Sequence, residues 1–255
     1  MNEYYTKEEI IRLREGGKAL AQLMRTLGEY IMPGISVHDI EMKVRELIAD
    51  CGGESATIGY SIPESPYPFP SAACISINDG VVHGIAYKNQ YVLQEGDVVS
   101  VDVVMKYQGI FVDICRTWGA GKLSKENQAL IKAARDTTDA AIRAAQVGNT
   151  VDDIGKAAEK TAQLHGFNTV RELGGHGVGK KIHMLPFIPN FAQSGFKDKI
   201  KEGMVLAIEP IVTAGDWRVK LDGDGWLFST RDGSNTAQFE ETVLVTKAGP
   251  EILTQ

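Results

Sequence analysis

An internal repeat constrains the fold of this 255-residue chain more than any other feature of its sequence. Segment 95–102 reads Glu-Gly-Asp-Val-Val-Ser-Val-Asp, and segment 202–209 reads Glu-Gly-Met-Val-Leu-Ala-Ile-Glu, so each copy ends an apolar β-type run on a carboxylate. Segments 33–40 and 147–154 also resemble each other, and each follows a long helical pattern. The joint match favours duplication over a chance likeness of short helices. It predicts two halves, roughly 6–120 and 121–250, whose carboxylates meet at a seam.

Helix signals occur at matching places in both halves. Thr6-Lys-Glu-Glu9 is a capping box that begins an amphipathic helix expected to run to about Tyr30, and Ser124 begins another to about Gln146. A further helix in each half should end near Cys51-Gly52 and near His165-Gly166, with glycine in the usual stop position. With strands before and after the helices, this order predicts an α+β domain around a mixed, largely antiparallel sheet. Because no linker divides the chain, we expect residues 1–255 to form a single domain.

Composition excludes several classes of protein. The chain is 43% hydrophobic and 24% charged, which is ordinary for a globular protein. A net charge of −6 without a basic block argues against a nucleic-acid partner. Three cysteines without CxxC spacing disfavour a disulfide framework or a zinc ribbon. No apolar run reaches ~20 residues and the first residues lack an apolar signal core, so we expect a cytoplasmic protein without a membrane partner.

Carboxylates inside apolar β-type runs predict a metal site. A buried, unpaired carboxylate costs several kcal/mol, roughly, unless a cation compensates it. Within the four runs concerned, Arg116 is the only Lys or Arg. A pair of divalent cations is the simplest compensating charge, and such a pair points to hydrolysis. The candidate ligands are Asp102, Asp113, His176, Glu209 and Glu240.

The two aspartates flank a hairpin turn around Tyr107-Gln-Gly109. By our count, a two-residue turn would place Asp102 and Asp113 directly opposite each other, and a glycine bulge would make them diagonal neighbours. Either arrangement brings like charges together on adjacent strands, which is unfavourable without a cation. The alternative is that one or both side chains lie in solvent at the edge of the sheet.

The other candidates leave similar choices open. His176 lies between glycines in Gly174-Gly-His-Gly177, which would let the backbone pass close to a site and aim the ring, although a lone histidine is more often structural. Glu240 and Glu241 point to opposite faces of a strand, and spacing alone does not say which faces the metal. An oxygen-rich set with one imidazole suits Mn(II), Fe(II), Co(II) or Zn(II), with carboxylates bridging two ions ~3.5–4 Å apart.

The chain resembles the type I methionine aminopeptidases in a series of motifs that spans nearly its whole length and keeps the family's order. The five-ligand pattern is shared with the wider pita-bread metallopeptidases, and the first two motifs are more particular to the methionine enzymes. The motifs are Ala73-Cys-Ile-Ser-Ile-Asn78, Val82-His-Gly-Ile85, Gly96–Asp102, Gly175-His-Gly-Val-Gly179, Ile208-Glu-Pro210, Thr230–Ser234 and Ala237–Thr242. The resemblance implies the pita-bread fold, in which two helix–helix–hairpin halves are related by a pseudo-twofold axis.

The resemblance also implies residue roles. Asp102 and Glu240 would be among the residues that bridge two metal ions, Asp113 would complete one site, and His176 and Glu209 the other. Glu209 would also be the general base that activates a bridging water or hydroxide. His83 and His183 would contact substrate, with His183 donating to the scissile carbonyl and the oxyanion. The specificity pocket would draw on Phe69, Cys74, Ile182 and Trp226, an apolar set suited to a thioether, although ordinary core packing also explains these four.

The activity implied is removal of the N-terminal methionine from peptides and nascent chains when the second residue is small. A monomer of the short bacterial form, with transient contact to the ribosome, would fit this role. Met184, Ala86-Tyr87 and Glu241 depart from the family's usual residues, and Ile62–Pro70 is unusually proline-rich and is expected to be a loop over another part of the molecule. None of these departures removes a ligand. The alternatives are a proline-specific exopeptidase of the same fold and an inactive peptide-binding homologue.

Overall fold

A computed structural model describes residues 4–63, 65–192 and 195–255, which form four helices and fifteen strands. The helices are α1 (Lys7–Gly28), α2 (Val37–Asp50), α3 (Lys125–Ala144) and α4 (Val151–Leu164). The strands up to residue 119 are β1 (Glu54–Ser55), β2 (Cys74–Ile77), β3 (Gly80–Val82), β4 (Val98–Tyr107) and β5 (Ile110–Gly119). Those after it are β6 (Asn168–Thr169), β7 (Gly174–Gly177), β8 (Met184–Pro189), β9 (Val205–Ile208), β10 (Ile211–Thr213), β11 (Val219–Leu221), β12 (Phe228–Thr230), β13 (Thr236–Gln238), β14 (Glu240–Thr246) and β15 (Gly249–Ile252).

The helices begin where the sequence predicts. At α1, the Thr6 side chain accepts the backbone N–H of Glu9 at 3.2 Å, and the Glu9 carboxylate accepts that of Thr6 at 2.7 Å, so the capping box is complete. At α3 the Ser124 side chain accepts the backbone N–H of Asn127 at 3.0 Å, a cap without the reciprocal bond of a capping box. Both long helices end slightly before the predicted residues. In the described ranges, no helix has the length and apolar character needed to cross a bilayer.

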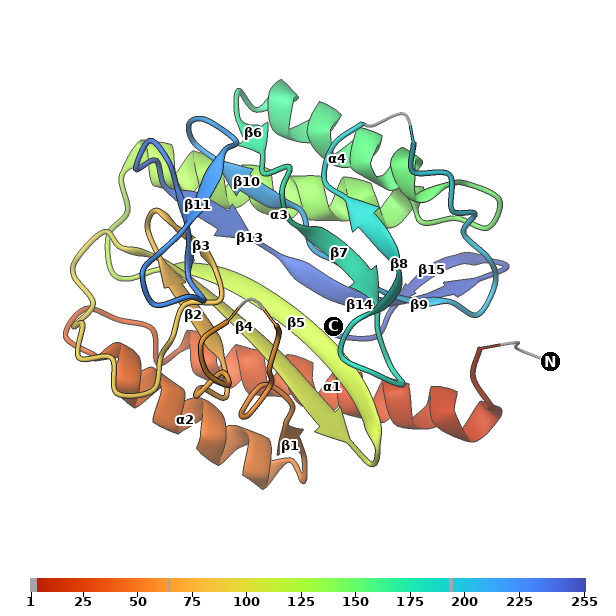
Figure 1. The fold of residues 1–255 in the computed structure, drawn as a ribbon, viewed down its shortest axis with the longest axis horizontal. Helices are drawn as coiled ribbons and strands as arrows, with labels where there is room; N and C mark the ends of the chain where they lie inside the picture. Colours follow the sequence, from red (N-terminus) through yellow and green to blue (C-terminus); the bar gives the residue numbers. More distant parts are fainter. Residues whose placement is uncertain (1–3, 64, 193–194) are drawn as a thin grey trace.

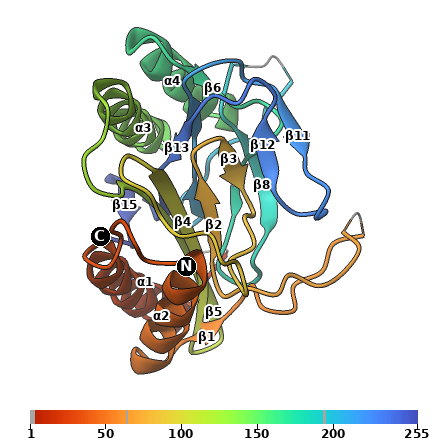
Figure 2. The same ribbon diagram turned by 90° about the vertical axis from the view of Figure 1, so that its left-hand side faces the viewer.

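The main sheet lies between the helices and the open face of the molecule. Its strands run in the order β1-β4-β5-β14-β9-β7-β8, with β2 added at β4 and β15 at β14, and each pairing is antiparallel. The remaining strands form two small sheets with the orders β13-β10-β6 and β11-β12-β3. Figure 2 shows the four helices on one side of the sheet and β3, β11 and β12 on the other. The chemistry therefore has to be sought on the face that the helices leave open.

Each half places a helix pair ahead of a central strand. In the first half α1 and α2 precede the β4–β5 hairpin, and Leu20 and Ile40 pack in one core with Val103 of β4. In the second half α3 and α4 precede β9, and Ile154 packs in a second core with Leu206 of that strand. There β9 pairs with β14, and the segment between them forms β10 to β13. The predicted α+β arrangement of two similar halves around an antiparallel sheet is confirmed.

A buried carboxylate on α2 fixes the chain that leads into β2. Glu41 is fully buried and accepts the backbone N–H of Ala72 at 2.7 Å and that of Ala73 at 3.2 Å. Arg45, one turn later on α2, donates to the same carboxylate at 2.7 Å and to the carbonyl of Pro70 at 3.0 Å. This pair therefore holds the segment that ends the proline-rich loop.

We expect Glu41→Ala to lower the free energy of unfolding by about 2–6 kcal/mol, because it leaves two buried amides without an acceptor at about 1–3 kcal/mol each. Glu46→Ala on the same helix is the matched control. It removes an exposed ion pair with Lys43 and should change stability by less than about 0.5 kcal/mol. Urea denaturation of both variants measures the difference, and equal stabilities would contradict the anchoring role of Glu41.

Candidate metal centre and substrate cavity

The β4–β5 hairpin places Asp102 and Asp113 on one face of the sheet. Its two-residue turn, Gln108-Gly109, has φ of 48° and 84°, a conformation that glycine adopts readily. In this register Asp113 lies opposite Val104, and Asp102 lies opposite Cys115. The aspartates are therefore diagonal neighbours. Our expectation that a two-residue turn would set them directly opposite was wrong. Asp113 is the fourth residue after the turn and therefore pairs with Val104, the fourth residue before it, whereas Asp102 is the sixth residue before the turn.

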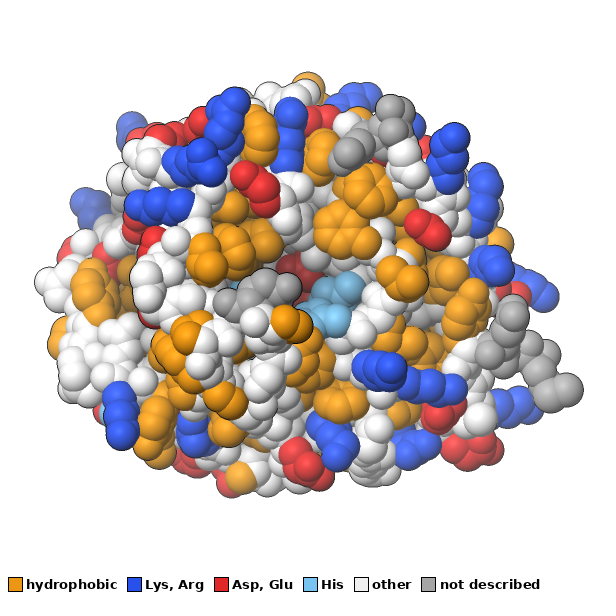
Figure 3. Space-filling view, viewed as in Figure 1, with side chains coloured by type: hydrophobic (Ala, Val, Ile, Leu, Met, Phe, Trp, Pro, Cys, Tyr) orange, Lys and Arg blue, Asp and Glu red, His pale blue; other side chains and the backbone are white. Residues whose placement is uncertain are grey.

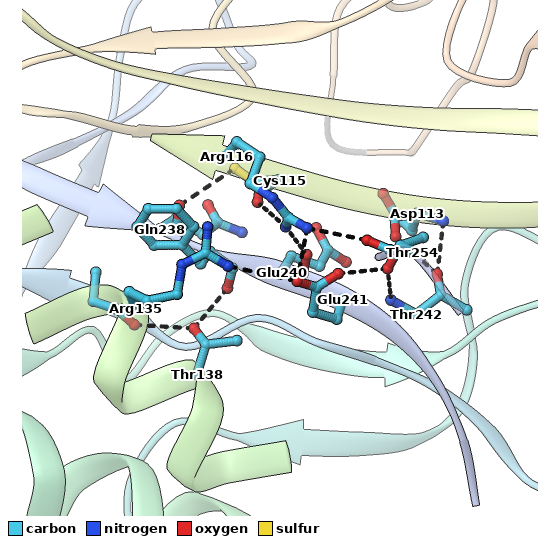
Figure 4. Close-up of polar contacts among 12 residues, drawn as sticks. Asp113, Cys115, Arg116, Arg135, Thr138, Gln238, Glu240, Glu241, Thr242 and Thr254 are labelled. Carbon is cyan, nitrogen blue, oxygen red and sulfur yellow. Dashed lines mark hydrogen bonds and ion pairs between the residues drawn. The ribbon is translucent and has the colours of Figure 1, made fainter. Parts of the chain in front are cut away.

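The next strand, β14, settles which of two adjacent glutamates faces the site. Glu241 points to an ion pair with Arg116 at 2.7 Å and accepts the Thr254 hydroxyl at 2.6 Å (Figure 4). Glu240 therefore takes the opposite face, where it lies across from Cys115 in the register that also places Cys115 across from Asp102. Arg116 holds this strand further by donating to the carbonyl of Glu240 at 2.7 Å.

The second half of the sheet brings in His176 and Glu209. His176, in β7, pairs with Ala207 of β9, and Glu209 directly follows β9. Its Nε2 atom lies 3.4 Å from Oε1 of Glu209 and 3.9 Å from Oδ2 of Asp113. A Cβ on Gly175 would come within 2.3 Å of the carbonyl of Ala207, so the close approach of β7 to β9 requires glycine beside the histidine.

The ring of His176 is oriented for use as a ligand. Its Nδ1 lies 3.0 Å from the carbonyl oxygen of Gly177. A carbonyl only accepts, so Nδ1 carries the proton and Nε2 presents a lone pair, as in histidines that bind metals. One ligand atom each of Asp113, His176 and Glu240 can be chosen so that all lie within 4.8 Å of one another.

The carboxylates are buried beyond what their hydrogen bonds compensate. Burial raises the pKa of Asp102 to about 7, and it raises the pKa of Asp113, Glu209 and Glu240 well above the usual range, helped in these three by neighbouring carboxylates. Oδ1 of Asp102, Oδ1 of Asp113 and Oε1 of Glu240 are enclosed and have no hydrogen-bond partner in the described residues. Such a set fits divalent cations, which would supply both the missing partners and the missing charge.

All eleven residues singled out in the sequence line one cavity of about 520 Å³. Figure 3 looks into the cavity, where histidine and acidic side chains are visible and apolar side chains surround them. The acidic and imidazole group is Asp102, Asp113, His176, Glu209 and Glu240, and the remaining residues are Phe69, Cys74, His83, Ile182, His183 and Trp226.

Aromatic packing builds one wall of the cavity. Phe69 and Trp226 contact edge to face with ring centroids 5.1 Å apart, and His83 contacts Trp226 at 6.3 Å. Burial, with repulsion from the neighbouring His183 imidazole when that ring is protonated, lowers the pKa of His83 to about 4, so the His83 imidazole is neutral. His83 adopts φ of 61°, which is uncommon for a residue with a side chain and is typical of positions held in place at sites.

The proline-rich loop lies over this wall, as expected, although Glu64 falls outside the described residues. The hydroxyl of Ser65 donates to the carbonyl of Gly225 at 2.9 Å, and that of Tyr67 donates to Asp224 at 3.0 Å. In return the indole N–H of Trp226 donates to the carbonyl of Tyr67 at 3.1 Å. The loop therefore fixes the tryptophan from outside.

Two residues of the site were missed in the sequence. Gln238 donates its amide N–H to Oε2 of Glu209 at 3.0 Å, and the hydroxyl of Tyr60 lies 2.7 Å from Nδ1 of His183. Strand alternation could have found Gln238, because it lies two residues before Glu240 on the same face. Tyr60 lies in a loop, where no periodicity indicates the direction of a side chain.

Comparison with known proteins agrees with this geometry. The model of metallopeptidase family M24 matches residues 12–247. A methionine aminopeptidase of Aquifex aeolicus is 43% identical over an alignment of 255 positions that covers 99% of this chain and 98% of that protein. The crystal structure of a methionine aminopeptidase from Thermotoga maritima superposes with a TM-score of 0.93 at 38% identity, with both chains covered completely. A prolidase from Pyrococcus furiosus reaches a TM-score of 0.77 at 23% identity over all of this chain and 66% of its own, which shows the shared fold.

The fold and the site define a metallopeptidase. The chain belongs to metallopeptidase family M24 and, within it, to the methionine aminopeptidases. The pita-bread fold and the peptide-hydrolase activity expected from the sequence motifs are thereby confirmed.

Proposed function

We propose that this protein removes the N-terminal methionine from peptides and nascent chains in the cytoplasm when the second residue is small, using two divalent metal ions. The observation that carries the proposal is the convergence of one imidazole and four carboxylates, of which Asp113 and Glu240 are buried, at the base of a cavity with an apolar wall. The family membership of the chain supports the same reading.

The proposed ligands divide between the two halves of the sheet. Asp102 and Glu240 would be among the bridging ligands, with Asp113 completing one site and His176 and Glu209 the other. When bound, the ions would acidify a water molecule and polarise the scissile carbonyl. The enclosed oxygen atoms of Asp102, Asp113 and Glu240 favour this assignment, because each lacks another partner in the described part of the chain.

The remaining steps are assigned to side chains. Glu209 would accept the proton of the attacking water and pass it to the leaving amine. Its Oε2 receives the Gln238 amide, which orients the carboxylate and leaves Oε1 on the side of His176. His183 would donate to the carbonyl oxygen as negative charge develops on it.

The apolar wall would hold the methionine side chain. Phe69, Cys74 and Trp226 form one buried cluster, against which Ile62 and Ile85 pack, and Ile182 lines the same cavity. A flexible thioether suits aromatic surfaces of this kind, at about 0.3–1.5 kcal/mol per sulfur–aromatic contact. His83, packed against Trp226, would contact the bound peptide near its N-terminus.

A substrate panel tests the proposal. The full chain with Mn(II), Co(II), Fe(II) or Zn(II) should hydrolyse Met-Ala-Ser, cleave a bulky second residue more slowly, and leave Xaa-Pro peptides largely intact. Preference for Xaa-Pro would indicate the proline-specific alternative. Binding of peptides without turnover, under every metal, would indicate the inactive homologue.

The two adjacent glutamates offer a matched test of the ligand set. Glu240→Gln should reduce the bound ions per chain from two towards one, because an amide is a weaker ligand than a bridging carboxylate. Glu241→Gln should keep both ions and lower the free energy of unfolding by about 1–3 kcal/mol, since its pair with Arg116 is structural. Metal analysis and urea denaturation separate the two. Loss of metal from Glu241→Gln alone would reverse the assignment.

A further inference from the structure

A tyrosine from the first half of the chain contacts a cavity histidine from the second half. The hydroxyl of Tyr60 lies 2.7 Å from Nδ1 of His183, and the two rings meet edge to face with centroids 5.4 Å apart. Both side chains line the cavity. Contact between residues so far apart in the sequence depends on closure of the whole fold.

The backbone of Tyr60 is held on both sides. Its N–H donates to the carbonyl of Thr57 at 2.9 Å, and its carbonyl accepts the N–H of Phe69 at 2.8 Å. Gly59 pairs back to Phe69 at 2.8 Å. The backbone of Tyr60 is therefore hydrogen-bonded to that of Phe69 in the apolar wall. These bonds fix the direction in which the phenol side chain leaves the loop.

The pair has a preferred direction of donation. Within residues 4–63, 65–192 and 195–255, the tyrosine hydroxyl and the imidazole are each other's sole hydrogen-bond partner. A neutral imidazole has one protonated and one bare nitrogen, and a phenol is a better donor than acceptor. When the hydroxyl donates to Nδ1, the ring proton resides on Nε2. The opposite arrangement would leave the phenol proton without an acceptor among these residues.

We infer that Tyr60 is a positioning residue, which selects the Nε2–H form of His183 and so makes this ring a hydrogen-bond donor to the substrate carbonyl. The inference rests on the substrate-contacting role proposed for His183. It adds that Tyr60 determines the tautomer and the orientation of the His183 ring. The edge contact of His183 with His176, at 4.4 Å between centroids, fixes the ring from the other side.

The tautomer can be observed without turnover. The full chain, labelled with 15N-histidine and supplied with Zn(II), has five histidines, and a His183→Gln variant assigns the His183 signals. At about pH 8, where neutral imidazoles predominate, wild-type His183 should be protonated at Nε2 and bare at Nδ1. Tyr60→Phe should shift it to a mixture of both forms. Protonation at Nδ1 in the wild type, or an unchanged spectrum in Tyr60→Phe, would overturn the inference.

Kinetics provide the second readout. Tyr60→Phe should lower kcat for Met-Ala-Ser on the order of tenfold with KM changed less than about twofold, as expected for a contact realised in the transition state. In a His183→Ala background the same change should have almost no further effect. An equal loss in both backgrounds would mean that Tyr60 acts independently of His183.

Tyr91→Phe is the matched control, because it removes a hydroxyl that donates to Asp97 and not to the histidine, from a residue that does not line the cavity. It should change kcat by less than about twofold and leave the His183 signals unshifted. Absence of peptide hydrolysis by the wild type would refute the proposed function while the tautomer result stands. Hydrolysis with the wrong tautomer would refute the role of Tyr60 alone.

Discussion

Glu209→Gln is expected to lower kcat by at least about 10²-fold, the low end for loss of a general acid–base group. The substitution keeps the size of the side chain and its contact with Gln238, but it removes the proton acceptor and one ligand charge. Because metal occupancy could change as well, kcat should be measured at saturating metal, and the bound ions should be counted in the same samples.

Glu202→Gln is the control for this change. Glu202 lies shortly before β9, pairs with Lys247 at the surface and is half exposed, so its neutralisation should leave kcat unchanged within about twofold. Turnover of Glu209→Gln at the wild-type rate would remove Glu209 from the mechanism. A loss that excess metal restores fully would limit Glu209 to a role as ligand.

The second large effect separates two histidines that contact each other in the cavity. His176→Ala should lose an ion, and excess metal should restore part of the activity, because Nε2 of His176 lies among the carboxylates. His183→Ala should keep its metal and lose kcat by about 10²-fold or more through the missing donor to the oxyanion.

Metal content and kcat for both variants decide between these roles. His165→Ala supplies the baseline, since His165 ends α4 and pairs with Asp136 at 2.9 Å, on another part of the molecule. If His183→Ala were the variant that loses metal, the two roles would be exchanged. The inference about Tyr60 would then fail with it.

Local chemistry made the helices predictable. The capping box at Thr6 and the cap at Ser124 depend on hydrogen bonds within a few residues, and both formed as expected. The choice between Glu240 and Glu241 could not be made in the same way. Both faces of β14 are buried, so alternation does not distinguish a solvent face from a core face. The positions of Arg116, Arg135 and Thr254, distant in sequence from β14, determine which glutamate is paired.

The spacing of residues in the sequence also could not predict which distant strands lie next to each other. Repeated carboxylates at Asp102 and Glu209 suggested that the two halves meet, but the contact of His176 with Asp113 depends on the order β5-β14-β9-β7 in the sheet. Tyr60 illustrates the same limit in a loop, because its partner His183 is set by closure of the fold. The chemistry of the side chains thus indicated which residues are candidate metal ligands, and the tertiary structure determines which of them lie together.

Metal titration of the full chain tests the central claim most directly. The protein is first stripped with a chelator, and Mn(II) or Co(II) is then added while bound ions and hydrolysis of Met-Ala-Ser are measured on the same samples. The account predicts close to two ions per chain, with activity that rises as they bind, because four carboxylates and one imidazole meet at the base of the cavity. Full activity at one ion per chain, or no activity with any of Mn(II), Co(II), Fe(II) and Zn(II), would contradict it.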